Sequence, residues 1–313
     1  MKYNDDANLD TSQVEDTRGG GGGGGLGGML GGKTAIGGGV GVVGVVIYLL
    51  VSLIGGGSGS QAIGQILSEL GQNGRPATVD NTDLAKKCKT GHDANTISDC
   101  ALVADIDSIQ AYWSTALPRI GGTYTKVPTR WFSGQVSTGC GAADSGAGPF
   151  YCPADKKVYI DLSFYNDIQT QFQTTDTPFV NAYVLAHEYG HHVQDLLGIE
   201  AKVHTRQGAT SDSVRLELQA DCFAGVWAKH ATEPGQNGET ALISDITQDD
   251  FDSALSVAGR IGDDWIQKNL GNGQINQNAF THGTSAQRRK WLTTGYQTGD
   301  PKACDTFSAT DLG

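Results

Sequence analysis

Three residues near the middle of the chain have the types and spacing of a metal site. His187, Glu188 and His191 form H-E-x-x-H within the segment L-A-H-E-Y-G-H-H-V-Q-D-L-L. Residues four apart share one face of an α-helix, so the two imidazoles can bind one ion. Two histidine nitrogens make half of a tetrahedral zinc site. Glu188 is offset around the helix, where its carboxylate can reach water on the metal, as does the general base of a metalloprotease.

This chemistry requires a helix, and the flanking residues favour one. Thr177 suits the N-cap, Pro178 the first helical position and Gly198 the C-terminal end. Apolar residues between them recur at helical spacing: Phe179, Tyr183, Ala186, Gly190, Val193 and Leu197. Because H-E-x-x-H is short, a chance match on a surface helix is the alternative.

Two other residues of the motif are interpreted as structural. His192 does not share the face of His187, so we interpret it as a neighbour rather than a ligand. Tyr189 points away from the metal by its spacing. The motif itself therefore supplies two ligands and one base.

A third ligand is expected from a second helix, which contains L-E-L-Q-A-D-C-F-A-G and can be capped by Ser211 or Asp212. Glu217 and Asp221 share a face of this helix. Glu217 is the candidate third ligand, and Asp221 the acceptor of a hydrogen bond from a ligating histidine. The alternative is a solvated acidic pair on an amphipathic helix. Two histidines, one glutamate and an open fourth position make a catalytic rather than a structural zinc site.

Composition limits the class of partner. The chain has 313 residues, 22 of them basic and 34 acidic, and a net charge of −12. Nucleic acid is excluded as the main partner, because phosphate binding needs a basic surface. The length indicates one principal domain with an N-terminal appendage.

The N-terminal part predicts a membrane anchor. Residues 1–34 are polar and then glycine-rich, and are expected to be a disordered cytoplasmic tail. Residues 35–54 carry no charge and have the length of one transmembrane helix. A linker over 55–75 and a domain over 76–313 follow. The few flanking charges place the N-terminus in the cytoplasm and the domain outside the cell membrane, periplasmic or extracellular. A buried core helix and a cleaved signal peptide are the alternatives.

The six cysteines suggest disulfides. An even number in an exported domain is typical of disulfide bonding, although sequence leaves fifteen connectivities open. Metal binding is the competing interpretation, but no C-x-x-C spacing supports it. We favour two local pairs and one long one: Cys88–Cys100, Cys140–Cys152 and Cys222–Cys304.

Periodicity predicts the elements around the motif. A helix from Asp99 to about Leu117 has an apolar core face, and a short strand is expected at 130–132. Residues 157–162 alternate like a half-exposed strand. We expect this strand to lie at the edge of the cleft, where a peptide substrate adds as another strand. An ordinary inner strand is equally open.

Several longer segments resemble the neutral zinc metallopeptidase family of bacteria. The likeness spans nearly the whole chain and is carried by C-G at 140–141, G-P-F-Y-C-P at 148–153, V-Y-I-D-L-S-F-Y at 158–165, A-Y-V-L-A-H-E-Y-G-H-H-V-Q, E-L-Q-A-D-C-x-A-G at 217–225, I-G-D-D at 261–264 and H-G-T-S-A-Q-R at 282–288. The resemblance implies a membrane-anchored enzyme with an α+β, zincin-like domain of the gluzincin type, mostly helical with a small sheet. It also implies Zn²⁺ held by His187, His191 and Glu217, with Glu188 as the catalytic residue.

The C-terminal part supplies a second catalytic candidate. Gluzincins need a donor for the oxyanion that forms on the carbonyl, and we assign this role to His282, with a packing histidine as the alternative. Asp263 and Asp264 could orient it, or form a solvated helix face. The expected function is hydrolysis of a peptide or protein substrate. A zinc hydrolase of another amide, such as cell-wall peptide, and a non-catalytic zinc-stabilised binding module remain open.

Overall fold

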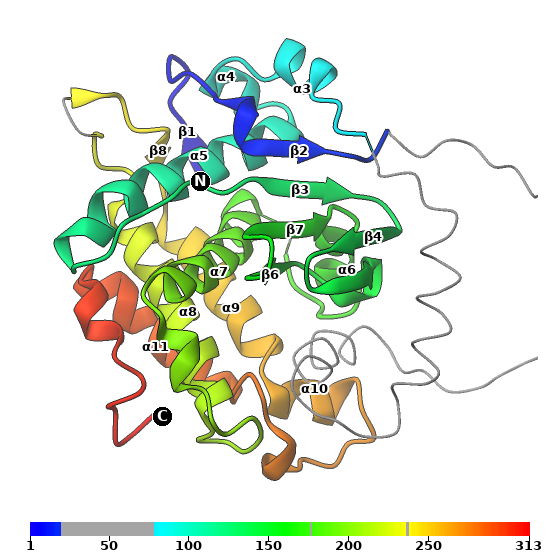
Figure 1. The fold of residues 1–313 in the computed structure, drawn as a ribbon, viewed down its shortest axis with the longest axis vertical. Coiled ribbons are helices and arrows are strands. Elements are labelled where there is room, and N and C mark those ends of the chain that lie inside the picture. Colours follow the sequence, from blue (N-terminus) through cyan, green and yellow to red (C-terminus); the bar gives the residue numbers. More distant parts are fainter. Residues whose placement is uncertain (20–77, 176, 236–237) are drawn as a thin grey trace, which may run out of the picture.

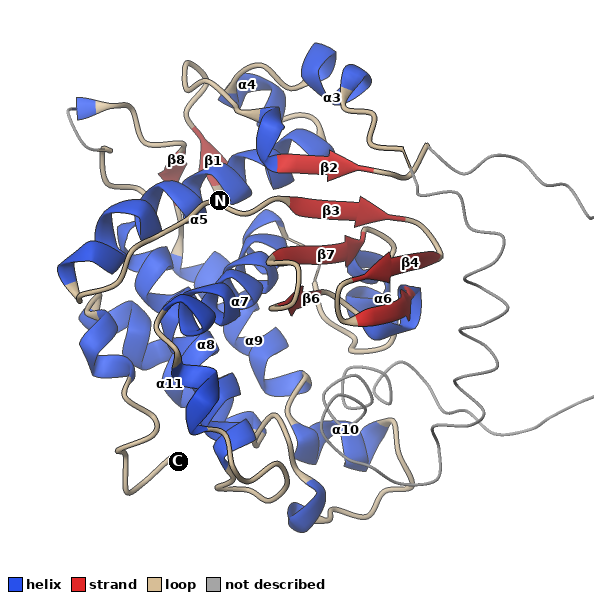
Figure 2. Cartoon of the chain, viewed as in Figure 1, coloured by secondary structure: helices blue, strands red, loops and turns tan. Residues whose placement is uncertain are grey.

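The computed structural model describes residues 1–19, 78–175, 177–235 and 238–313. About half of the described part of the chain is helical, and it also forms a small sheet (Figures 1 and 2). The helices are α3 (Thr82–Lys87), α4 (Gly91–Ala94), α5 (Ser98–Arg119), α6 (Phe164–Thr170), α7 (Pro178–Leu196), α8 (Asp212–His230), α9 (Gln248–Arg260), α10 (Asp263–Asn269) and α11 (Ser285–Thr298). The strands are β1 (Lys2–Tyr3), β2 (Val14–Asp16), β3 (Thr129–Phe132), β4 (Gln135–Thr138), β5 (Gly141–Asp144), β6 (Phe150–Cys152), β7 (Lys157–Asp161) and β8 (Ile243–Asp245).

The main sheet has four strands in the order β2-β3-β7-β6. Strands β2, β3 and β7 are parallel, and β6 is antiparallel to β7. The edge position expected for 157–162 is therefore wrong, because β7 lies inside the sheet between β3 and β6. A short connection, residues 153–156, turns the chain back so that β6 pairs along the other edge of β7. Strand β6 takes the edge position instead.

The long helices pack together on one side of this sheet (Figure 2). Helix α7 contacts β6, α5 and α8, and α8 in turn packs against α11. The apolar face expected on the helix from Asp99 is confirmed, since Ile106, Ile109 and Trp113 of α5 are fully buried. Close packing along most of their length holds α7 and α8, the two helices of the candidate site, in a fixed relation.

Glycines allow the central helices to approach closely. A Cβ added at Gly190 of α7 would lie 3.0 Å from Cα of Ala220 on α8. A Cβ at Gly295 of α11 would lie 1.9 Å from the carbonyl oxygen of Cys222 on α8. Neither position has room for a side chain, so these glycines set the spacing of α7, α8 and α11.

The first residues of the chain belong to the folded domain. Strand β1 pairs antiparallel with β8, and β2 pairs parallel with β3. The Tyr3 hydroxyl donates to Asp105 of α5 at 3.0 Å, and the Asp10 amide donates to Asp107 at 2.7 Å. The expected disordered tail over 1–34 is therefore wrong for residues 1–19, because their strands and hydrogen bonds are part of the sheet and core. Residues 20–34 lie outside the described part of the chain.

The expected membrane topology is corrected for the same reason. Strands β1 and β2 pair with strands of the domain itself, which contradicts the expected single pass with the N-terminus cytoplasmic and the domain outside. Among the described residues, no helix combines the length and the apolar character that crossing a membrane requires. The segments predicted as an anchor, 35–54, and a linker, 55–75, lie outside the described residues.

The favoured disulfide connectivity is confirmed. Two bonds are local and the third joins α8 to the C-terminal segment: Cys88–Cys100, Cys140–Cys152 and Cys222–Cys304. The long bond links residues 82 apart in sequence. It ties the segment after α11 to the helix that carries Glu217.

Candidate metal centre

The H-E-x-x-H segment lies on α7, and the expected ends of this helix are confirmed. The Thr177 side chain accepts a hydrogen bond from the Val180 amide at 3.2 Å, and Pro178 occupies the first turn. Gly198, just beyond the C-cap, adopts the left-handed conformation with φ 66°. The helix therefore begins and ends where local sequence dictates, and presents His187 and His191 on one face.

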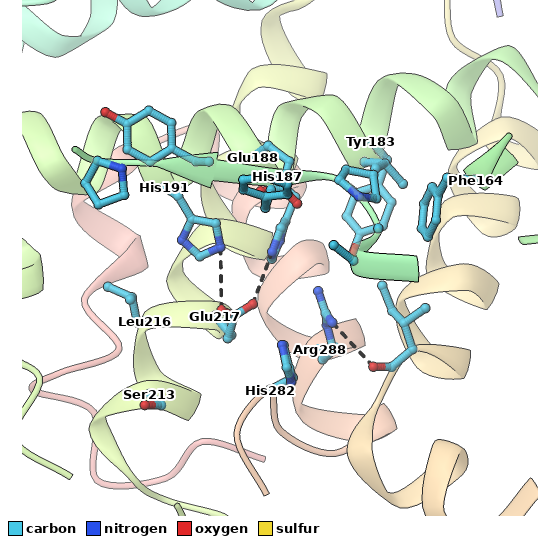
Figure 3. A pocket seen from close by; sticks show the side chains of 18 of the residues that line it. Phe164, Tyr183, His187, Glu188, His191, Ser213, Leu216, Glu217, His282 and Arg288 are labelled. Atoms are coloured by element: carbon cyan, nitrogen blue, oxygen red, sulfur yellow. Dashed lines mark hydrogen bonds and ion pairs between the residues drawn. The ribbon is translucent and has the colours of Figure 1, made fainter. Parts of the chain in front are cut away.

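Three donor groups converge between α7 and α8. The Nε2 atom of His187 lies 3.2 Å from Oε2 of Glu217, and Nε2 of His191 lies 3.5 Å from Oε1 of the same carboxylate (Figure 3). The donor atoms of all three residues lie within 4.8 Å of one another. Ligands of a tetrahedral zinc ion at about 2.0–2.1 Å are about 3.4 Å apart. The spacing and the chemistry of these donors therefore fit a zinc ion.

Asp221 orients the first histidine. Its Oδ1 lies 2.9 Å from Nδ1 of His187 and accepts a hydrogen bond from the Tyr183 hydroxyl at 2.7 Å. Arg288 of α11 donates to the same carboxylate through Nε at 2.8 Å and Nη2 at 2.9 Å. A carboxylate of this kind accepts hydrogen bonds, so Nδ1 of His187 carries a hydrogen and Nε2 faces Glu217. This is the orientation that a ligand requires.

The buried charges of the site shift several pKa values. Burial alone would raise the pKa of Asp221, but the positive charges of Arg288 and His187 outweigh it and lower that pKa to about 2. Burial alone would lower the pKa of His187, but Asp221 and Glu217 raise it to about 10. The imidazoles outweigh burial at Glu217 and hold its pKa well below the usual range. A metal ion that binds His187 must displace a proton, since only the neutral ring is a ligand.

Glu188 lies beside the donors with a different environment. It is buried and lines the same cavity as His187 and His191. Burial raises the pKa of its carboxyl, although both histidines and the backbone amide of Tyr151 on β6 oppose the shift. A carboxylate with a raised pKa is a better proton acceptor than an exposed one.

His282 reaches the site from the loop before α11, and Asp263 holds that loop. Oδ2 of Asp263 accepts the backbone amides of Thr281 and His282 at 2.7 Å each, and that of Gly283 at 3.0 Å. Nδ1 of His282 lies 2.8 Å from Oγ1 of Thr281 and 3.6 Å from Oδ1 of Asp263. The I-G-D-D and H-G-T-S segments thus meet, and Asp263 orients His282 rather than forming a solvated face.

A cavity of about 380 Å³ opens in front of the donors. It is lined by Glu188, Glu217 and His282, and by apolar side chains that include Phe150, Phe164, Phe172, Val184, Ile261 and Ile266. Figure 3 shows Phe164 on one side of the site and Leu216 and Ser213 on the other. The edge strand β6 contributes Phe150 and Tyr151 to its wall.

Over residues 1–307 the chain matches the family described as "Putative neutral zinc metallopeptidase". The chain belongs to this family. It is 47% identical over 252 residues to the uncharacterized protein Mb2605 of Mycobacterium bovis, covering 80% of this chain and 84% of that protein. It is 45% identical over 201 residues to the uncharacterized protein YpfJ of Escherichia coli K12, covering 62% of this chain and 66% of that protein. No solved structure matches the chain.

Membership of the neutral zinc metallopeptidase family makes zinc the cofactor and peptides the substrate class.

The two residues of the motif interpreted as structural lie where expected. Nε2 of His192 lies 2.8 Å from the carbonyl oxygen of Thr125, and the Tyr189 hydroxyl lies 2.8 Å from Oγ1 of Thr129. Both side chains point to the sheet side of α7.

Sequence reasoning missed three residues of this metallopeptidase site. The apolar pattern indicates Tyr183 only as part of a packing face, although Tyr183 precedes His187 by one helical turn and donates to Asp221. Gln194 follows His191 by three residues, and its Oε1 lies 2.8 Å from Nδ1 of that ring. The i, i+3 and i, i+4 spacings could have identified both. Arg288 had no such signal, since only the fold brings α11 beside α8.

Proposed function

We propose that this chain is a zinc-dependent peptidase in which His187, His191 and Glu217 hold the metal. The observation that carries the proposal is the convergence of two Nε2 atoms and one carboxylate, at the spacing of ligands around one ion, on the wall of a cavity. With Glu217 as the third ligand, the site is of the gluzincin type, and we assign the domain to the zincin-like class on this ground.

Zinc, when bound, acts as a Lewis acid that polarises a carbonyl and makes water a stronger nucleophile. Glu188 takes the proton of the water that attacks the peptide carbonyl, then gives it to the departing amine. Its buried carboxyl and raised pKa suit both transfers. Asp221 keeps His187 oriented for the metal through Nδ1.

His282 donates a hydrogen bond to the carbonyl oxygen as negative charge develops there. Thr281 and Asp263 contact its Nδ1, which leaves Nε2 for the substrate. Asp263 also favours the charged ring, since together with Glu217 it raises the pKa of His282 against the effect of burial. A peptide in extended form adds to the outer side of β6, the edge strand that contributes Phe150 and Tyr151 to the cavity wall beside Glu188.

The test compares metal content and peptide cleavage in substituted chains. Glu188→Gln is expected to retain zinc and lose cleavage of a denatured peptide library, because the amide cannot accept the proton. His187→Ala is expected to lose both. Glu200→Gln, which removes another carboxylate that lines the cavity, and His204→Ala, which removes an exposed histidine, are the matched controls and should retain both.

Each outcome assigns a role. Loss of zinc in Glu188→Gln would contradict its role as base, and cleavage by His187→Ala would contradict the metal site. Zinc-loaded wild-type chain that cleaves no peptide, but hydrolyses cell-wall peptide or merely binds peptides, would replace the proposed reaction with one of the two alternatives.

A further inference from the structure

The second histidine of the motif is held by neutral side chains rather than by a carboxylate. Nδ1 of His191 lies 2.8 Å from Oε1 of Gln194, a fully buried residue of α7. Nε2 of Gln194 donates to the Leu216 carbonyl at 2.7 Å and to Oε1 of Gln219 at 3.1 Å. Nε2 of Gln219 donates to the Cys304 carbonyl at 2.9 Å. These contacts form one chain from the C-terminal segment to the ring.

The two backbone carbonyls determine the direction of every hydrogen bond in this series from Cys304 to His191. A carbonyl oxygen only accepts, so the amide nitrogen of Gln219 must face Cys304 and that of Gln194 must face Leu216. The amide oxygen of Gln194 therefore faces His191, and Nδ1 of that ring must be the donor. A neutral imidazole with hydrogen on Nδ1 has its lone pair on Nε2. Nε2 is the atom that lies 3.5 Å from Glu217.

We propose that Gln194 and Gln219 are positioning residues that hold His191 in the tautomer that binds zinc, through an amide chain anchored by the Cys222–Cys304 disulfide. The inference rests on the proposed metal site and adds the groups that prepare it. Neutral amides suit this position, because Glu188, Glu217 and Asp221 already place three carboxyl groups around the site. It also accounts for the glutamines in H-E-Y-G-H-H-V-Q and E-L-Q-A-D-C.

The Cys222–Cys304 disulfide fixes one end of this series of hydrogen bonds. Cys222 lies on α8, one residue after Asp221 and five after Glu217, and its bond to Cys304 holds the segment after α11 against that helix. The Cys304 carbonyl can set the direction of the Gln219 amide only while it stays beside α8. Opening the bond should therefore loosen the acceptor and weaken zinc binding.

The first experiment measures zinc affinity of the metal-free full chain by competition with a chromogenic chelator. Gln194→Leu and Gln219→Leu are expected to weaken zinc binding by about 10–100-fold, since outer partners of ligating histidines have effects of this size. Gln110→Leu is the matched control. Gln110 is also fully buried, and its amide donates to Gln13 and accepts from Tyr124 and from the Val127 amide, none of which is a proposed zinc ligand. Its loss should lower stability and leave zinc affinity unchanged.

The second experiment compares two disulfide deletions in the same assay. Cys222→Ser with Cys304→Ser should weaken zinc binding, whereas Cys88→Ser with Cys100→Ser should not, because that bond anchors α5 away from the site. The ¹⁵N NMR chemical shifts of the His191 ring report its tautomer directly. Wild type should show the tautomer with hydrogen on Nδ1, and Gln194→Leu a mixture of the two tautomers. Unfolding of each metal-free variant in urea shows which variants are folded at the start.

Two results would overturn the inference: wild-type zinc affinity in folded Gln194→Leu, or equal weakening in Gln110→Leu. These results differ from failure of the metal site itself. If His187→Ala binds zinc as tightly as wild type, the proposed function fails with the inference. If His187→Ala loses zinc and Gln194→Leu does not, only the amide chain is wrong.

Discussion

Replacing Arg288 by methionine tests how far the site depends on one buried ion pair. Arg288 is 3% exposed and Asp221 fully buried, and two hydrogen bonds of 2.8 and 2.9 Å join them. Methionine keeps much of the side-chain length but leaves the buried Asp221 carboxylate without the guanidinium that donates two hydrogen bonds to it. Breaking such a pair costs about 3–5 kcal/mol. We expect Arg288→Met to lower the free energy of unfolding by this amount, a large fraction of a typical total of about 5–15 kcal/mol.

The assay is urea unfolding followed by tryptophan fluorescence, with a chelator present so that metal binding does not contribute. Arg260→Met is the matched control. Arg260 donates to the backbone carbonyls of Phe172 and Gln173 at 2.7 and 2.8 Å, so its loss leaves no buried charge behind. We expect the control to lose about 0.5–1.5 kcal/mol per hydrogen bond at most.

A double variant separates the charge from the packing. Asp221→Asn combined with Arg288→Met removes the charge together with its partner, and should recover about 0.5–3 kcal/mol relative to the sum of the single losses. The reasoning is refuted if Arg288→Met loses no more stability than Arg260→Met, or if the losses of the two single variants simply add.

Three further predictions address the elements that support the site. Burial raises the pKa of Asp107 from 3.8 to about 8, so between these pH values the folded chain keeps a proton that the unfolded chain releases, and the free energy of unfolding falls as pH rises. Asp107→Asn should reduce the slope of this pH dependence by up to about 1.4 kcal/mol per pH unit. Equal slopes for variant and wild type in urea unfolding would contradict the prediction. Gly190→Ala should cost about 1–3 kcal/mol, because the new methyl group meets Ala220 at 3.0 Å, and a variant with unchanged unfolding would show that α7 and α8 can separate freely. Thr177→Ala should cost about 1 kcal/mol through the lost cap, visible as a lower melting temperature, and an unchanged value would mean that the Val180 amide finds another acceptor.

The helices of the site were predictable because their signals are local. The start of α7 is marked by Thr177 and Pro178 and its end by Gly198, and each signal lies within a residue or two of the helix end that it predicts. Ser211 marks the start of α8 in the same way. Helical periodicity then decides which side chains share a face. The pairs His187 with His191 and Glu217 with Asp221 follow from that periodicity alone.

The placement of the N-terminus and of the strands was not predictable in this way. Residues 1–19 have no strong local signal, and β2 gains its structure by pairing with β3, more than a hundred residues later. Strand β7 shows the same limit, since alternation predicts a strand but not its neighbours. Pairing between distant segments depends on which surfaces the whole fold leaves open.

The sequence by itself determined the metal-binding residue types, the two helices that carry them and the favoured disulfide partners. Tertiary structure alone decided that α8 brings Glu217 to within 3.2 Å of His187, that Arg288 neutralises Asp221, and that two glutamines link His191 to Cys304. The physical reason is the distance along the sequence over which each kind of interaction acts. Helix caps and periodicity act over a few residues, whereas buried charges and amides acquire partners only when distant elements pack together and exclude water.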